Sequence, residues 1–244
     1  MSVRITLATA GRVLRQLRRD HRTLALVLFV PTLLMTLFRY VFDGQEATFD
    51  RVGPPMVGIF PFVTMFLVTS IAMLRERTTG TLERLMSMPL AKLDLLLGYG
   101  LAFAAVAVVQ ASLTAAVAFG LLGLDAAGPV WLVVVLAVAN AVLGMALGLF
   151  LSAFAQTEFQ AVQFMPAFVL PQLLLAGLLV PTEQMARVLE LISYALPMTY
   201  AYDALARAAT DVLDARLAFD AAVIAGFIVV ALVLGASTLR RRTA

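Results

Sequence analysis

Long apolar stretches alternate with short polar ones along most of the chain. Six of these stretches carry almost no charge. A helix rising about 1.5 Å per residue needs about 20 such residues to cross a hydrocarbon core of about 30 Å. They predict membrane spans at residues 24–42, 56–74, 95–122, 130–154, 159–180 and 219–239. The predicted fold class is therefore all-α integral membrane, with six transmembrane helices in a single domain over residues 1–244.

The segment before the first span, residues 1–23, has the pattern of an amphipathic helix. Its apolar side chains fall at helical spacing at Val3, Leu7, Ala10, Leu14 and Leu17, and most of its arginines lie on the other side. Such a helix lies on a membrane surface, with the apolar stripe in the acyl boundary and the arginines on anionic head groups. A solvated basic tail that only fixes topology is the alternative interpretation.

A charged loop at residues 75–94 follows the second span. Thr78, Thr79 and Gly80 should end the helix, and Thr81 can cap a new one that stops at Pro89. On this short helix, Leu82, Leu85 and Met86 share a face, opposed by Glu83 and Arg84. A membrane-skimming helix without a partner would have the same pattern.

The segment at residues 181–218 is too long for a turn and too polar for a span. Its pattern predicts one or two short helices that dip into the outer leaflet and are broken at Pro197. Tyr194, Tyr200 and Tyr202 would then lie at the interface. A plain extracellular hairpin is the alternative.

The spans also contain small and polar residues. Asn140, Gly144, Gly148 and Ser152 recur every four residues, which predicts a close helix–helix seam. Four polar side chains lie at membrane depth, where they normally face protein or water: Gln110, Asn140, Gln163 and Gln172. They are candidates for a translocation path, a subunit interface or interhelical hydrogen bonds. Prolines at 31, 61, 166 and 171 should kink their helices.

Composition agrees with the membrane class, since the chain is 62% hydrophobic and 14% charged. With the N-terminus inside, 13 of the 18 basic residues fall on the inner side and 5 on the outer side. The positive-inside rule therefore predicts cytoplasmic termini in a multi-pass protein, and the basic charge requires no nucleic-acid partner. With no cysteine and one histidine, Cys-based and His-rich metal sites are excluded.

Two motifs resemble those of the type 2 ABC exporter permeases, especially the daunorubicin-resistance permease group. The first is an E-R-x-x-G-T-L-E-x-L-x-x-x-P-like segment, read here from Glu76 and Arg77 to Pro89. The second is a Leu-Pro-x-Thr-Tyr-x-x-Asp-Ala-like segment that begins at Leu196. The resemblance covers essentially the whole chain. One departure is Tyr99, where many relatives place a lysine.

The resemblance implies the membrane half of an exporter. The small loops and the apolar, Met- and Phe-rich spans suit a hydrophobic or amphipathic cargo, such as a drug-like compound or a lipid. The permease would sit in the plasma or inner membrane as a homo- or heterodimer, in contact with membrane lipid and with two cytoplasmic ATPase subunits. The short helix of the charged loop would dock on the ATPase, using Glu76, Arg77, Gly80, Thr81, Leu82, Glu83, Arg84, Leu85 and Met86. The outer segment suggests an extracellular gate at Leu196, Pro197, Met198, Thr199, Tyr200 and Tyr202. Relatives of the same architecture export polysaccharides or glycolipids, which remains the alternative.

The chain's own residues agree with a separate ATPase. A P-loop needs G-x-x-x-x-G-K-[ST], and the only lysine, Lys92, lies outside such a motif. The chain is therefore expected to bind no cofactor and to be no enzyme, with ATP and Mg²⁺ on the partner. A polytopic enzyme would need clustered carboxylates, and the spacing of Asp203, Asp211, Asp214 and Asp220 predicts no common face. An enzyme and a membrane scaffold are the less favoured readings.

Overall fold

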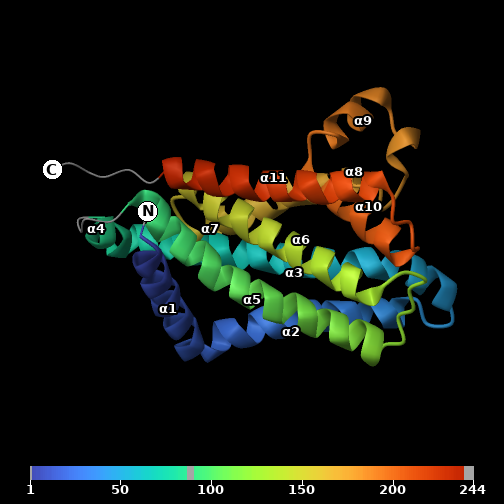
Figure 1. Ribbon diagram of the computed structural model, residues 1–244, viewed down its shortest axis with the longest axis horizontal. Helices are drawn as coiled ribbons and strands as arrows, with labels where there is room; N and C mark the ends of the chain where they lie inside the picture. Colours follow the sequence, from blue (N-terminus) through green and yellow to red (C-terminus); the bar gives the residue numbers. More distant parts are fainter. Residues whose placement is uncertain (1, 87–90, 239–244) are drawn as a thin grey trace.

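In the computed structural model, the described part of the chain (residues 2–86 and 91–238) is built of helices and connecting turns (Figure 1). The side chains of Glu83 and Met86 lie outside that description. Five of its helices are long and apolar enough to span a membrane, and they run along the length of the molecule. They are α2 (His21–Val41), α3 (Glu46–Thr78), α5 (Lys92–Gly120), α6 (Val130–Leu151, extended by a 3₁₀ turn to Phe154) and α11 (Ala215–Ser237). The predicted all-α membrane class is confirmed.

The core is centred on α3 and α6, whose most apolar windows are each 67% buried. The small-residue stripe of α6 lies against α3, so the predicted helix–helix seam is confirmed. A Cβ on Gly144 would collide with the carbonyl oxygen of Phe62, and one on Gly148 would lie 2.5 Å from that of Phe66. The Thr69 hydroxyl also donates across the seam to the Met145 carbonyl at 3.2 Å. Glycine therefore sets the distance between these helices.

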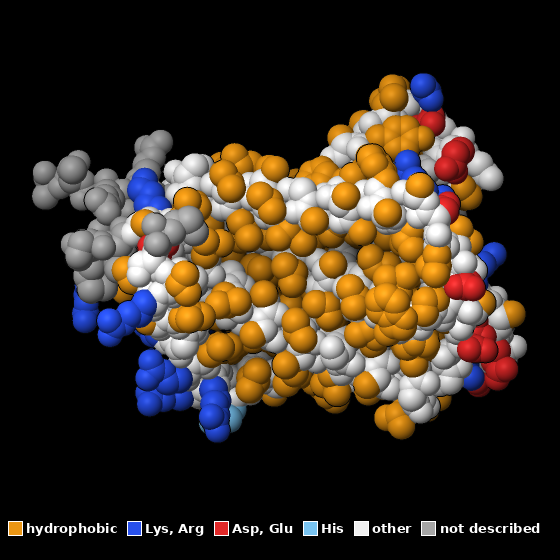
Figure 2. Space-filling view, viewed as in Figure 1, with side chains coloured by type: hydrophobic (Ala, Val, Ile, Leu, Met, Phe, Trp, Pro, Cys, Tyr) orange, Lys and Arg blue, Asp and Glu red, His pale blue; other side chains and the backbone are white. Residues whose placement is uncertain are grey.

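The first and last spans, α2 and α11, lie at the periphery, with 17% and 22% of their most apolar windows buried. Their exposed side chains include Leu26, Phe29 and Leu37 on α2 and Val229 and Val233 on α11. Figure 2 shows a broad apolar surface between a basic end and an acidic end of the molecule. Such a surface suits lipid between two polar boundaries.

The expected sixth span, residues 159–180, is not one continuous α-helix. The chain forms α7 (Glu158–Phe164), then a π-helical turn (Met165–Val169), then α8 (Leu170–Leu175). Pro166 and Pro171 lack the N–H that a continuous α-helix requires, which explains the interruption. By contrast, α2 and α3 continue through Pro31 and Pro61.

The expected start of the second span was wrong. Residues 43–55 were assigned to an outer loop, but α3 begins at Glu46 and includes Pro54 and Pro55. Because this first part of α3 carries Glu46, Asp50 and Arg51, it does not read as apolar. The helix is therefore ten residues longer at this end than hydropathy indicated.

The remaining helices lie at the two ends of the bundle. At the basic end, α1 (Val3–Arg19) crosses the long helices at a steep angle and packs on α5, and α4 (Thr81–Met86) follows α3 (Figure 1). Towards the acidic end, a 3₁₀ turn (Thr182–Gln184) leads to α9 (Arg187–Ser193), which projects from the body, and then to α10 (Pro197–Ala209). The predicted short helices and the break before Pro197 are confirmed.

Candidate functional site at the basic end of the bundle

The turn between α3 and α4 depends on Gly80. Its φ of +73° lies in the left-handed region, which favours glycine, and no heavy atom lies within 4 Å of a Cβ built there. The carbonyl of Gly80 accepts the first bond of α4, from the Arg84 N–H at 3.0 Å. The predicted helix break is thus confirmed. The expected N-cap was misplaced, because Gly80 holds the cap position and Thr81 is already helical.

The apolar face of α4 is directed towards this chain's own core. Leu82 is 5% exposed and belongs to the core, and Leu85 packs against it. Leu82 was expected to anchor a partner, but its burial leaves it unavailable for that role. Arg84 is exposed on the other side of the helix. The side chains of Glu83 and Met86, both assigned to partner contact, lie outside the described part of the chain.

Three consecutive residues at the end of α3 connect it to three other helices. Since neighbours on an α-helix are about 100° apart, Arg75, Glu76 and Arg77 project in different directions. Arg75 donates to both carboxylate oxygens of Glu158 on α7, at 2.6 and 3.0 Å. Arg77 donates to the Thr238 hydroxyl, at the end of α11, at 3.2 Å. Glu76 faces Arg12 of α1 at 3.6 Å.

The Arg75–Glu158 contact is the most regular of the three. It is bidentate, which is the strong form of an arginine–carboxylate pair. Hydrogen bonding from Arg75 lowers the pKa of Glu158 below its usual value. Both side chains are more than half exposed, at 57% and 52%, so the pair orients the two side chains but adds little stability.

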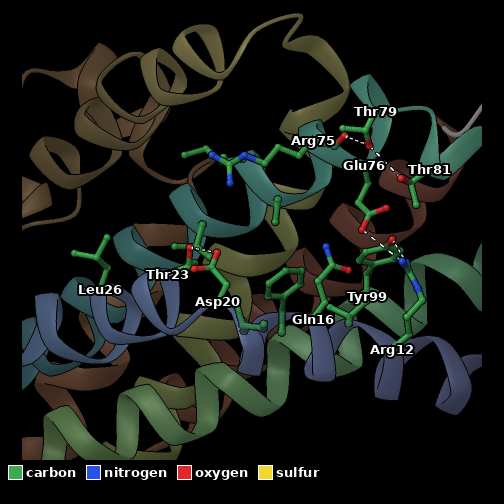
Figure 3. A pocket seen from close by; sticks show the side chains of 16 residues that line it. Arg12, Gln16, Asp20, Thr23, Leu26, Arg75, Glu76, Thr79, Thr81 and Tyr99 are labelled. Carbon is green, nitrogen blue, oxygen red and sulfur yellow. Dashed lines mark hydrogen bonds and ion pairs between the residues drawn. The ribbon is translucent and has the colours of Figure 1, made fainter.

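Helices α1, α3 and α5 are joined by contacts among the side chains of Arg12, Glu76 and Tyr99 (Figure 3). The Arg12 guanidinium donates to the Tyr99 hydroxyl and lies 5.5 Å from the centre of its ring. The adjacent Gly98 permits this approach, since a Cβ there would lie 2.5 Å from Cβ of Thr9. The sequence did not assign Arg12 and Tyr99 to a site. The only signal was the departure from the resembling family at Tyr99, beside a glycine.

Glu76 was expected to contact a partner surface, but the structure places it inside the chain. Its exposed fraction is 7%, and its carboxylate is directed to Arg12. One oxygen, Oε2, is buried without a hydrogen-bond partner among the described residues. Glu76 therefore links α3 to α1 rather than presenting charge to a second protein.

The four polar residues at membrane depth do not form one lining. Gln110 and Asn140 are fully buried on α5 and α6, and neither side chain has a hydrogen-bond partner in the described structure. Gln172 is buried and donates to the Phe168 carbonyl at 3.1 Å. Gln163 is exposed on α7. Three therefore lie inside the protomer and one at its surface.

The residues of the expected outer gate begin α10. Pro197, Met198 and Thr199 are buried, and Met198 has no exposed surface. The Thr199 hydroxyl donates to the Ser193 carbonyl at 2.8 Å, and the Tyr200 hydroxyl donates to the Tyr194 carbonyl at 2.7 Å. Leu196 precedes the helix, and Leu196, Tyr200 and Tyr202 are half-buried. This part of α10 thus ties α9 to the bundle, while the exposed apolar surface lies on α9.

Ion pairs bring together carboxylates for which the spacing predicted no common face. Arg216 contacts Asp203 at 3.5 Å and the buried Asp220 at 3.1 Å. Arg207 contacts Asp203 at 2.9 Å and Asp214 at 3.0 Å. The expectation of scattered acids was therefore wrong, because α10 and α11 converge in space. Since each of these three carboxylates is paired with an arginine, the cluster is a structural link between these helices.

Comparison with known proteins decides the class. The ABC-2 type transporter family matches residues 5–208, which is most of the chain. The chain belongs to the ABC-2 type transporter family. It is therefore a multi-pass membrane protein of the ABC transporter class. The family match includes α1, the α3–α4 turn and α10.

Individual relatives agree with this assignment. The chain is 30% identical over 152 residues to ABC transporter G family member 23 of Dictyostelium discoideum, covering 62% of this chain and 22% of that protein. It is 27% identical over 152 residues to the probable multidrug ABC transporter permease YbhR of Escherichia coli, covering 62% of this chain and 41% of the relative. For YbhS of the same organism, identity is 24% over 163 residues, 66% of this chain and 43% of the relative. The alignments span less than half of each of these relatives.

Proposed function

We propose that this ABC-2 type subunit exports a hydrophobic or amphipathic cargo from the cytoplasm or inner leaflet, driven by ATP hydrolysis on two copies of a partner ATPase. Two of the relatives, YbhR and YbhS, are probable multidrug permeases, which supports this cargo class. A polysaccharide or glycolipid cargo is the alternative within the same architecture. A second permease protomer would complete the pathway.

The contacts at the end of α3 carry the coupling part of the proposal. A movement of α4 reaches α3 through Gly80, and α3 is bonded there to α7, α1 and α11 through Arg75, Glu76 and Arg77. Coupling needs an element whose two arrangements are biased from both sites. The helix end is such an element, because displacing it must break or carry along all three contacts.

The orientation is part of the proposal. The basic end, with α1, α4 and the end of α3, would face the cytoplasm, and the acidic end would face outside (Figure 2). In that arrangement, residues 1–23 form the interfacial helix, residues 75–94 the coupling loop and residues 181–218 the outer segment.

Charge exchange between Arg75 and Glu158 tests the coupling. We expect Arg75→Glu and Glu158→Arg each to lower permease-stimulated ATP hydrolysis about two- to fivefold, equivalent to about 0.5–1 kcal/mol of coupling. The double variant should recover most of the loss, because it restores the opposite charges. ATPase association, measured by copurification, should persist in all three variants, since neither residue lies on α4.

Two results would contradict the proposal, and they can be told apart. If no ATPase chain copurifies with the wild type, the assignment as an ATP-driven exporter subunit fails. If the ATPase binds and both single variants stimulate hydrolysis like the wild type, coupling does not pass through this contact.

A further inference from the structure

A cavity of about 550 Å³ lies at the basic end, between α1, α2, α3 and α5 (Figure 3). Its volume is within the range typical of small-ligand sites, about 300–1,000 Å³. One part of its wall is apolar, with Val13, Leu17, Val68, Ile71 and Phe103. Polar and charged side chains complete the wall. The cavity therefore suits an amphipathic molecule.

The charge of the cavity differs from that of its surroundings. Four charged residues line it: Arg12, Asp20, Arg75 and Glu76. Arg75 is neutralised from outside by its bidentate contact with Glu158. One cation and two carboxylates remain, which leaves a surplus of negative charge at the most basic end of the molecule (Figure 2).

Both carboxylates have acceptor capacity left. Asp20 is held in place by Thr23, whose N–H and hydroxyl donate to it at 3.1 and 2.6 Å, and these bonds lower its pKa. Glu76 extends from α3 towards Arg12 and Tyr99, and its buried Oε2 has no hydrogen-bond partner among the described residues (Figure 3). A buried acceptor without a donor costs free energy, so a ligand that donates there gains affinity.

Arg12 does not donate a hydrogen bond to Oε2 of Glu76. Its guanidinium is engaged with the Tyr99 hydroxyl and lies 3.6 Å from Oε1, the other oxygen of Glu76. Glu76 lines the cavity, so a small cationic donor bound there would complement its carboxylate. A primary ammonium carries three N–H donors on one compact charge, which matches this requirement.

We propose that this cavity binds an amphiphile with a primary ammonium group, which donates to Glu76, while its apolar chain lies against Val13, Val68, Ile71 and Phe103. The site is contained within one protomer. Its lining includes Leu26 of α2, which is 60% exposed on the apolar surface. We therefore expect the ligand to enter from the membrane side. The site goes beyond the proposed export function and does not depend on the ATPase.

A binding experiment uses the absence of cysteine in this chain. A single cysteine at Leu26, labelled with a polarity-sensitive fluorophore, reports on the opening of the cavity. Leu33 lies on the same face of α2, two helical turns further along and outside the cavity, so a label there measures partition into the surrounding membrane. The protein in phosphatidylcholine nanodiscs is titrated with decylammonium and with decanol, which share the chain and differ in charge.

After subtraction of the Leu33 signal, decylammonium should bind at least tenfold more tightly than decanol. Glu76→Gln keeps the size of the side chain and removes its charge, so it should reduce this ratio to about one. Ala72→Phe fills the apolar part of the cavity and should weaken both ligands, whereas Ala105→Phe, on the exposed face of α5, should weaken neither.

Equal affinities for the two ligands in the wild type would overturn the proposal. So would an unchanged ratio in Glu76→Gln, provided that the variant elutes as a single species with the wild-type volume. If that variant does not fold, the comparison of Ala72→Phe with Ala105→Phe decides: equal affinities in these two would exclude the cavity as the binding site.

Discussion

The seam between α3 and α6 allows a stability prediction to be worked from distances. In Gly148→Ala, the new Cβ would lie 2.5 Å from the Phe66 carbonyl oxygen, whereas ordinary contact begins at 3.4 Å. The two backbones must separate by the difference, because the obstacle is main chain and no rotamer change relieves it. The same methyl group collides with the Thr69 hydroxyl, which donates across the seam to the Met145 carbonyl.

The contributions to the free energy of unfolding sum to a net destabilisation. Overpacking a close contact costs about 1–3 kcal/mol, and backbone obstruction places this one near 3. Loss of the interhelical bond adds about 0.6 kcal/mol. The better helix propensity of alanine returns about 1 kcal/mol. The net destabilisation is therefore roughly 2–3 kcal/mol, or a fall in Tm of roughly 5–10 °C at the 2–4 °C per kcal/mol usual for this size.

A matched control lies on α11. Gly226 is also a helical glycine, but no heavy atom stands within 4 Å of a Cβ built there. Gly226→Ala should therefore leave Tm unchanged or raise it, because alanine adds up to about 1 kcal/mol of helix propensity. Both variants can be compared in mild detergent by size-exclusion chromatography of heated samples. If Gly148→Ala melts at or above the Tm of Gly226→Ala, the two helices are not in close contact and the reasoning is wrong.

Three further predictions concern the membrane orientation, acid stability and the outer segment. On intact cells, an impermeant thiol reagent should label a single cysteine at Thr210 and should not label one at Gln156, both of which are exposed positions. The reverse result would invert the topology. Because the pKa of Glu158 is lowered, its carboxylate stays charged and paired with Arg75 at neutral pH, and the pair is lost only in acid, as pH falls through that lowered pKa. Glu158→Gln should therefore leave the shape of the pH profile of permease-stimulated hydrolysis unchanged between pH 6 and 8. Met198 is buried, so a contact between protomers is better tested at Leu191, which is 55% exposed on α9. If α9 closes the outer end of the pathway, a cysteine at Leu191 should cross-link the two protomers and block export. Uninterrupted export from the cross-linked protein would contradict this.

The sequence predicted those parts of the fold whose pattern is local. Hydropathy located α2, α5, α6 and α11, and the four-residue spacing of Asn140, Gly144 and Gly148 predicted the α6 seam. The same criterion failed at the start of α3, because acidic residues at a helix end resemble a loop. Between residues 159 and 180 the prolines predicted a distorted helix, but the π-helical turn at Met165–Val169 between α7 and α8 was not predicted.

The candidate site was predicted less completely. The motif around Gly80 was located from the sequence, but its partners are Arg12, Tyr99, Glu158 and Thr238, all distant along the chain. Their proximity depends on how α1, α5, α7 and α11 pack, which no local spacing encodes. Burial of Glu76 and Leu82 follows from the same packing. A charged or apolar residue in a loop motif therefore did not reveal whether it faces a partner or the chain itself.

The length of α3 has a mechanical consequence. Its 33 residues correspond to about 50 Å of helix, well beyond a hydrocarbon core of about 30 Å. One helix therefore joins the turn at Gly80 to the opposite polar surface, where the carboxylate of Asp50 accepts a hydrogen bond from the Asp125 N–H. Near its middle, α3 packs closely against Gly144 and Gly148 of α6. Substitutions at either end of α3 are therefore expected to affect the far side of the membrane.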